Sequence, residues 1–340
     1  MMRENNESTI GQTSSKIDKV LSSKWYQLIL KLQSTISYCT YDFFRKKLFD
    51  AAMLPVTTGS ITSPMGLGSD SQPVKINLFN SSTYLADSMQ FHLEYLLRIS
   101  DKGVFYIMPT FRGEDPDFRH LNQFSHIEAE IKGGLNTVTD LIDEYLIYLV
   151  EQIVYQHGDD ILQITGDIKH LEHITVNKKD AISRISFSEA LNKLGKDNIS
   201  CFSYYEGEII GLSNEGEKKL SDQLEGIVCL THLPKIGVPF YQADANDNTH
   251  TLCADYLAGI GEFLGCGERH ISYQATLDAL KEREVQPDKY DWYLEIKNKY
   301  PMQTSGFGLG VERFLLWLLK YEDIRDIPLI SRLKGFPCNP

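Results

Sequence analysis

The stretch from Phe111 to Phe124 gathers arginine, glutamate, histidine and aromatic side chains in the run Phe-Arg-Gly-Glu-Asp-Pro-Asp-Phe-Arg-His-Leu-Asn-Gln-Phe. Pro116, which stands between two aspartates, marks a turn. Residues 104–111 and 124–131 are rich in β-branched and aromatic side chains, which predicts the two strands of a hairpin. The charged loop is either a solvated hairpin tip or a nucleotide site. In a nucleotide site a guanidinium meets phosphate, a carboxylate reads an exocyclic amine and a ring stacks on the base.

A second suggestive segment runs from Gly306 to Gly310, where glycine alternates with larger residues before Val311-Glu312-Arg313. Alternating glycines leave one face of an extended chain bare, so another group can approach the backbone. The apolar run Phe314–Leu319 predicts a buried helix. Arg313 therefore lies at a strand–helix junction, where an arginine can meet a phosphate. The alternatives are a simple turn or bulge and a surface arginine.

These two segments resemble motifs 2 and 3 of class II aminoacyl-tRNA synthetases, and the aspartyl and asparaginyl enzymes most of all. Ala254–Leu257 with Gly261-Glu262, and Asp323–Leu329, match the same enzymes in the same order. The resemblance covers roughly residues 45 to 340. It implies an α+β fold, the class II synthetase and biotin synthetase-like catalytic fold with an antiparallel β-sheet flanked by helices. It also implies an ATP-dependent ligase.

The implied reaction is attack of a carboxylate on the α-phosphate of ATP, which gives an acyl adenylate and pyrophosphate. Such a displacement needs positioning and charge neutralisation rather than a nucleophilic side chain. Arg112 and Arg313 match the catalytic arginines: the first bridges the carboxylate and the α-phosphate, and the second holds the γ-phosphate and one face of the base. Glu114 matches the reader of the adenine amino group, Arg119 and His120 the pair that reaches the γ-phosphate. The residues implied to bind ATP are Arg112, Glu114, Arg119, His120, Phe124, Gly308, Gly310 and Arg313.

Asp255 and Glu262 are two carboxylates seven residues apart on a strand-like segment. On a regular strand this spacing places them on opposite faces, but Gly259 and Gly261 allow a bulge that brings them together. In the resembled enzymes the matching pair holds Mg²⁺ between the phosphates, and hard oxygen ligands suit that ion. The alternative is two unrelated surface acids.

Arg269 matches the arginine that grips the substrate's side-chain oxygen, which indicates aspartate or asparagine. Ser88 and Gln90 match substrate-contacting positions. Aspartyl enzymes carry a lysine where Leu93 stands, whereas Gln-x-His-Leu-Glu is the asparaginyl pattern, in which Glu94 accepts from the carboxamide. Because a buried carboxylate opposes a second one, this pattern favours asparagine.

The sequence departs from the resembled enzymes in three places. The loop between the two hairpin strands is one residue shorter. The acid that holds the substrate's α-ammonium has no clear counterpart: an ungapped match falls near Ser63–Met65, and Asp70 or Asp87 is a possible substitute. Gly265-Cys266-Gly267 replaces a Gly-Gly-Ser triplet, and we interpret Cys266 as a small buried filler.

Three functions stay open. The first is adenylation of asparagine, or a close analogue, with transfer to tRNA or another acceptor. The second is an asparagine-synthetase-like amide ligase that adenylates the aspartate β-carboxylate for attack by ammonia; the missing ammonium-binding acid favours it. The third is a paralogue that binds an amino acid without catalysis. The pocket residues favour the first.

The chain of 340 residues is expected to form a single catalytic domain over residues 17–340, after a disordered polar N-terminus over 1–16. Within it we predict a helical arm over 17–49 and an insertion of helices and turns at about 160–235. About 50 residues precede the catalytic region, so we expect no anticodon-binding barrel. We also predict a helix over 137–156 with a capping box at its start, and strands over 240–260.

Composition sets further limits. The net charge is −12, and the sequence shows no basic cluster that indicates a patch for binding nucleic acid. The six cysteines are scattered without a Cys-x-x-Cys pair, which predicts reduced thiols in the cytoplasm and no structural zinc. No apolar run is long enough to span a bilayer, so no membrane partner is expected. The resemblance also implies a homodimer, with ATP and Mg²⁺ as cofactors.

Overall fold

The computed structural model describes residues 13–62, 72–178 and 180–338. Residues 1–12, the segment Ser63–Met65 and Asp70 lie outside the described residues, so the predictions that fall on them have no structural counterpart here. Helix α1 (Thr13–Ser22) begins inside the stretch predicted to be disordered, so residues 13–16 are helical. Helix α2 (Lys24–Lys46) follows, and its N-cap Ser23 accepts a hydrogen bond from the Trp25 amide.

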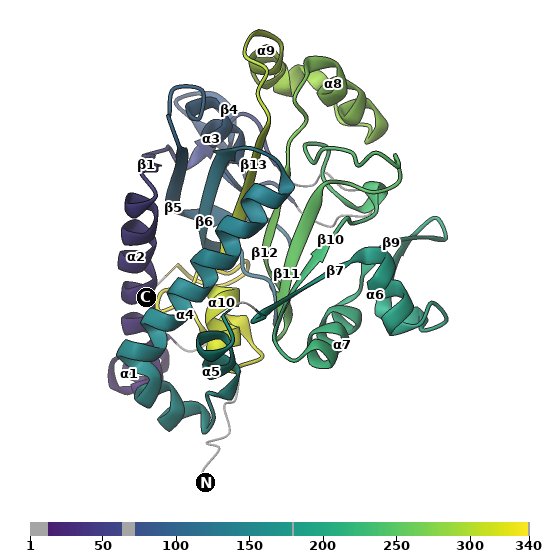
Figure 1. Cartoon of the computed structure of the whole chain (residues 1–340). Helices are drawn as coiled ribbons and strands as arrows, with labels where there is room; N and C mark the ends of the chain where they lie inside the picture. Colours follow the sequence, from purple (N-terminus) through teal and green to yellow (C-terminus); the bar gives the residue numbers. More distant parts are fainter. Residues whose placement is uncertain (1–12, 63–71, 179, 339–340) are drawn as a thin grey trace.

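The centre of the fold is a mixed sheet with the strand order β1-β5-β6-β13-β12-β11-β10-β7 (Figure 1). Its inner pairs are antiparallel, and only the outer pairs β1–β5 and β10–β7 are parallel within the described residues. This confirms the predicted antiparallel sheet flanked by helices. The strands are β1 (Asp50–Ala51), β5 (Gly103–Phe111), β6 (Gln123–Lys132), β7 (Ile182–Ser186), β10 (Ile227–Thr231), β11 (Cys253–Ala258), β12 (Gly261–Glu268) and β13 (Thr304–Gly310).

One face of this sheet is covered by helices α2 and α4 (Leu135–Thr165), with α10 (Val311–Leu318) below them (Figure 1). Phe44 of α2 stacks on Phe105 of β5 with ring centroids 4.6 Å apart, and Tyr145 of α4 packs against Phe307 of β13. Because side chains alternate along a strand, the glycines and acids of the same strands point to the opposite face. That face remains open for a ligand.

The start of α4 differs from the prediction. The helix begins at Leu135, two residues before Thr137, and no capping box forms there. Glu268 of β12 accepts a hydrogen bond from the Leu135 amide at 3.1 Å instead. A carboxylate from a strand distant in sequence thus caps the N-terminus of this helix, instead of the local side chain that the sequence predicts.

The segment at 160–235 contains more strand than predicted, because β7 and β10 join the main sheet. β10 is buried throughout and lacks the polar–apolar alternation that identifies a strand from sequence. A small hairpin of β8 (Phe202–Tyr205) and β9 (Glu208–Leu212) stands apart from the sheet. The helical pieces are α5 (Lys169–Val176), α6 (Phe187–Leu194), α7 (Asn214–Leu224) and the short turns η1 (Ile199–Cys201) and η2 (Lys235–Gly237).

Residues 240–252, predicted as strand, form a loop with isolated bridges rather than a continuous ladder. The remaining elements are β2 (Thr57–Thr58), β3 (Lys75–Leu78), β4 (Ser81–Leu85), α3 (Gln90–Leu96), α8 (Tyr273–Glu282), η3 (Pro287–Tyr290), α9 (Asp291–Lys299) and η4 (Ile324–Asp326). Among the described helices, none combines the length and the apolar character needed to cross a membrane.

Candidate active site

A single register row across the open face forms the floor of a cleft. Leu230 of β10 lies opposite Asp255 of β11, and the row continues through Gly265, Gly308 and Glu128. Paired residues of antiparallel strands project to the same side, so this row presents an apolar side chain, a carboxylate, two bare glycines and a second carboxylate. A cavity of about 460 Å³ and a smaller adjoining one lie above it. They share Arg112, His126, Glu262 and Gly308, so we describe them as the two ends of one cleft.

All the predicted ATP-binding residues line the smaller cavity, which we call the nucleotide end. The Arg112 guanidinium lies over the Phe124 ring, 5.4 Å from its centroid. Arg119 is buried, yet its Nε and Nη1 have no hydrogen-bond partner among the described residues, and the same holds for Arg112 Nε. Buried guanidinium donors without partners favour an anionic ligand at this end of the cleft.

Neighbouring acids position these cations. Arg119 Nη2 donates to Glu217 Oε2 of α7 at 2.8 Å, and the Glu262 amide donates to the same oxygen at 3.2 Å. Arg313 Nη1 donates to the Glu262 carbonyl at 2.8 Å. His120 Nδ1 lies 2.9 Å from Asp117 Oδ1, while burial and then Arg313 lower the pKa of its imidazole.

The Asp255 and Glu262 carboxylates come together with the help of a bulge, as predicted, but on two strands rather than one. The strands form a hairpin whose turn uses positive φ at Gly259 and Gly261, and their register shifts between Tyr256 and Leu257. A Cβ placed on Gly265 would lie 3.0 Å from Glu262 Oε1 and 3.6 Å from Asp255 Oδ1, so both carboxylates lean over this glycine. Burial, and then Glu262 and Glu217, raise the pKa of Asp255 well above its ordinary value. A bound cation would relieve this repulsion.

No cluster of three acid, histidine or cysteine side chains suited to a metal occurs in the described ranges. Two carboxylates nevertheless fit Mg²⁺, which keeps several waters and takes its other ligands from substrate phosphates.

The larger cavity has a polar part, which we call the amino-acid end, lined by the predicted residues Ser88, Gln90 and Arg269. Arg269 is buried; its Nη2 donates to Glu130 Oε1 at 2.6 Å and its Nη1 donates to Gln242 Oε1 at 2.9 Å. In the described structure Gln90 Nε2 and Glu130 Oε2 are buried without partners, which leaves one donor and one acceptor unused beside Arg269. Cys266 is buried, as expected of a filler.

The structure does not bring Glu94 into this group. Its carboxylate is fully buried and accepts hydrogen bonds from Lys297 Nζ at 2.6 Å and from the Tyr293 hydroxyl at 2.7 Å. Leu93 is also buried, in the cluster with Met89 and the β5 side chains, and does not line the cleft. Helix α3 presents its first residue, Gln90, to the cleft and carries its next turn into the protein.

Sequence reasoning missed two residues of the β6 floor. Glu128 accepts from the Ser88 hydroxyl at 2.8 Å and contacts the Tyr106 hydroxyl, and burial raises the pKa of its carboxyl to about 8. His126 lines both ends of the cleft, and burial followed by Arg112 lowers the pKa of its imidazole to about 3. The alternation His126-Ile-Glu128-Ala-Glu130 carried this signal, because its polar positions share one strand face.

Asp87, named as a substitute for the missing ammonium-binding acid, also lines the amino-acid end. Its carboxylate accepts from the amides of Thr62 and Ser88 at 3.1 and 3.0 Å.

The chain is similar in sequence and fold to known class II synthetases. The family described as tRNA synthetases class II (D, K and N) matches residues 15–334. The asparagine–tRNA ligase of Thermoplasma acidophilum is 27% identical over 311 residues, covering 90% of this chain and 69% of the relative. That of Lactobacillus johnsonii is 29% identical over 350 residues, covering 97% and 77%. The structure of asparaginyl-tRNA synthetase from Pyrococcus horikoshii complexed with asparaginyl-adenylate superposes with a TM-score of 0.85 at 26% identity, covering 96% of this chain and 72% of that one.

Proposed function

Because the chain belongs to the class II tRNA synthetase family (D, K and N), we propose that it is an ATP-dependent ligase that adenylates asparagine and transfers it to tRNA or another acceptor. One observation carries the proposal: Arg112 lines both the nucleotide end and the amino-acid end of the cleft. A guanidinium in that place can touch a carboxylate and an α-phosphate together, which is the contact that adenylation requires.

The residues around Arg112 bind the rest of the nucleotide and its metal ion. The unpaired Nε and Nη1 of Arg119, together with Arg313, neutralise the β- and γ-phosphates, and Phe124 stacks on adenine. Asp255 and Glu262 would hold Mg²⁺, which neutralises the leaving pyrophosphate when it is bound. The bare backbone of Gly308 lets the nucleotide lie close to the floor.

Asparagine fits the unused polar atoms of the amino-acid end. A carboxamide has an oxygen that can accept from Arg269 or Gln90 Nε2, both of which line this end, while Glu130 lies behind the lining and orients Arg269. We assign the α-ammonium group to the Asp87 carboxylate, which lines this end. The assembled catalytic set argues against a paralogue that only binds an amino acid.

A second candidate, an aspartate amide ligase, is favoured by one contact. Lys297 neutralises Glu94, so Glu94 no longer opposes a substrate carboxylate near Arg269. The test is ATP–pyrophosphate exchange with asparagine and with aspartate, each with and without ammonia. Exchange with asparagine supports the first proposal. Exchange with aspartate, followed by appearance of asparagine when ammonia is added, would replace it with the second.

We also propose a homodimer. The family resemblance supports it, and Tyr38 of α2 and Met53, close after that helix in the chain, are 73% and 100% exposed. Multi-angle light scattering at micromolar concentration tests this, and a monomer would refute it. The cytoplasmic location expected from the cysteines stays a prediction.

A further inference from the structure

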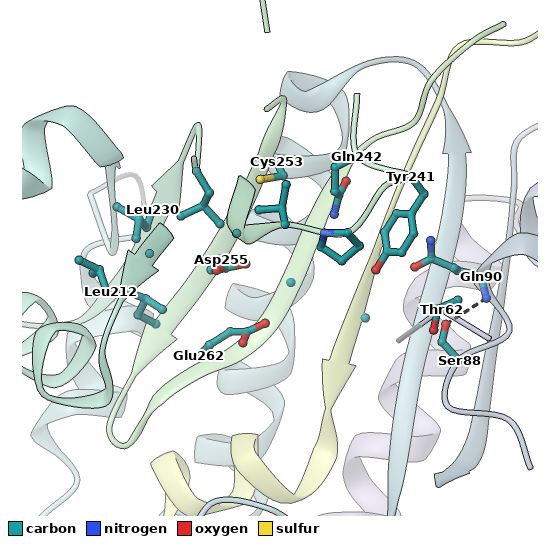
Figure 2. A pocket seen from close by; sticks show the side chains of 18 of the residues that line it. Thr62, Ser88, Gln90, Leu212, Leu230, Tyr241, Gln242, Cys253, Asp255 and Glu262 are labelled. Carbon is teal, nitrogen blue, oxygen red and sulfur yellow. Dashed lines mark hydrogen bonds between the residues drawn. The ribbon is translucent and has the colours of Figure 1, made fainter. Parts of the chain in front are cut away.

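Gln242 is a residue of the amino-acid end that has no part in the adenylation scheme so far. It lines the cavity and is only 8% exposed. Its backbone forms an antiparallel bridge with Arg269, so the two side chains leave neighbouring segments toward the same face. Figure 2 shows the Gln242 side chain at the wall of the cavity, next to Tyr241. Gln242 is thus placed to share a ligand with Arg269.

Two glycines of the floor make room for the oxygens that hold Arg269. Gly267 of β12 and Gly306 of β13 are register partners. A Cβ placed on Gly267 would lie 2.1 Å from Gln242 Oε1, and one placed on Gly306 would lie 2.1 Å from Glu130 Oε1. These two oxygens accept hydrogen bonds from Arg269 Nη1 and Nη2. The bare floor therefore fixes the Gln242 amide together with the guanidinium.

Arg269 also decides which end of the Gln242 amide faces it. A guanidinium has N–H donors and no acceptor, so the atom 2.9 Å from Arg269 Nη1 must be the amide oxygen. The Nε2 group then points away from the guanidinium, and it has no hydrogen-bond partner among the described residues. Nε, Nη1 and Nη2 of Arg269 each donate one hydrogen bond, so each terminal nitrogen keeps a second N–H. The two side chains therefore offer free donors side by side.

The charge around these donors favours a neutral acceptor. Glu130 Oε1 lies 2.6 Å from Arg269 Nη2, and both side chains are buried, so the positive charge of the guanidinium is already balanced. An aspartate carboxylate would add an unbalanced buried charge, which is costly. A carboxamide oxygen adds no charge, and its two lone pairs suit two donors.

We propose that Gln242 is a specificity-determining residue, whose Nε2 group donates to the side-chain carbonyl oxygen of asparagine while its Oε1 orients Arg269. The inference rests on the proposed adenylation of asparagine. It gives the substrate carboxamide a contact in the cleft that Glu94 cannot supply, because Glu94 is turned into the protein toward Lys297.

The variant Gln242→Glu separates the two contacts, because it keeps an oxygen for Arg269 and replaces the free donor with an acceptor. In pyrophosphate exchange the KM for asparagine should rise about tenfold or more, the scale of one lost hydrogen bond, while the KM for ATP changes less than about twofold. Gln242→Met removes the donor without adding a charge and should raise the KM for asparagine as well. The matched control Gln223→Glu, exposed on α7 and outside the cleft, should keep both constants.

The outcomes separate this inference from the function beneath it. An unchanged KM for asparagine in Gln242→Glu would overturn the contact, because Gln242 would then only orient Arg269. A KM for ATP that rises in step with the KM for asparagine would overturn it too, because the change would then act on the whole cleft. If melting curves show that Gln242→Glu does not fold, Gln242→Met decides by the same comparison. Wild-type protein without asparagine-dependent exchange would instead overturn the proposed function itself.

Discussion

Replacing Lys297 with methionine should lower the free energy of unfolding by about 3–5 kcal/mol, the usual cost of removing one partner of a buried ion pair. Lys297 Nζ and Glu94 Oε2 lie 2.6 Å apart, and both side chains are 0% exposed. The substitution leaves a buried carboxylate with Tyr293 and Thr304 as hydrogen-bond donors and Arg98 4.0 Å away. With an unfolding entropy of about 2.1 cal/mol/K per residue, the melting temperature should fall by roughly 4–7 °C.

The double variant Glu94→Gln with Lys297→Met separates charge from shape. It removes both charges and keeps an oxygen that accepts from the Tyr293 hydroxyl, so its free energy of unfolding should lie within about 1–2 kcal/mol of the wild-type value. Neither side chain lines the cleft, so the double variant should retain asparagine-dependent pyrophosphate exchange.

Thermal unfolding followed by circular dichroism measures the stability of each variant. Exchange of labelled pyrophosphate into ATP measures its response to asparagine. A double variant as unstable as Lys297→Met would refute the ion-pair argument. A double variant of near wild-type stability that no longer responds to asparagine would mean that Glu94 reads the substrate, as the sequence pattern predicted.

The other predictions concern the cleft. Arg112→Ala should abolish pyrophosphate exchange and shift the melting temperature by no more than about 1 °C, because a half-buried hairpin arginine contributes little packing; normal exchange would contradict its role. Gly308→Ala should fold, since the new Cβ meets Glu128 Oε1 at 3.1 Å, but should raise KM for ATP at least about tenfold by lifting the floor; an unchanged KM means that the nucleotide does not lie there. Asp255→Asn should melt higher than wild type without ligand, because carboxylate repulsion is lost, and should lose stabilisation by Mg²⁺ with ATP, both measured by thermal shift. In the folded protein Glu128 holds its proton up to about pH 8, whereas the unfolded chain loses it near 4.5, so stability falls as pH rises through this interval; Glu128→Gln should flatten the fall between pH 6.5 and 8 in melts at several pH values, and an unchanged slope would refute the shift.

The local sequence pattern was enough to predict structure where the interacting residues are close together in the chain. The hairpin around residues 104–131 and the passage from glycine strand to helix at Val311 have strong local signals, and the structure confirms both. The predicted nucleotide residues also meet in one cavity. Glycines and a turn proline indicate such features directly. Glycine permits backbone dihedral angles that other residues avoid, and proline fixes φ, whatever the surroundings of the segment.

What the sequence could not supply depends on partners far away along the chain. Glu94 is turned inward by Lys297, 203 residues later, and no local pattern encodes that pairing. The start of α4 depends on Glu268, 133 residues from the amide it caps. The sequence predicts β10 only as part of an insertion, because a fully buried strand has no two-residue alternation of polar and apolar side chains.

The place of β13 in the sheet has a consequence for synthesis of the chain. β13 pairs with β6 on one side and β12 on the other, yet it is made after both. Until the ribosome releases residues 304–310, β6 and β12 each expose an edge of unpaired amides and carbonyls, and such edges invite pairing with other chains. The nascent protein would already contain the charged hairpin and the carboxylate pair, but without the intervening strand they have no common floor. Nucleotide binding should thus appear only with the last step of assembly, so it can serve as a direct signal that the newly made sheet has closed.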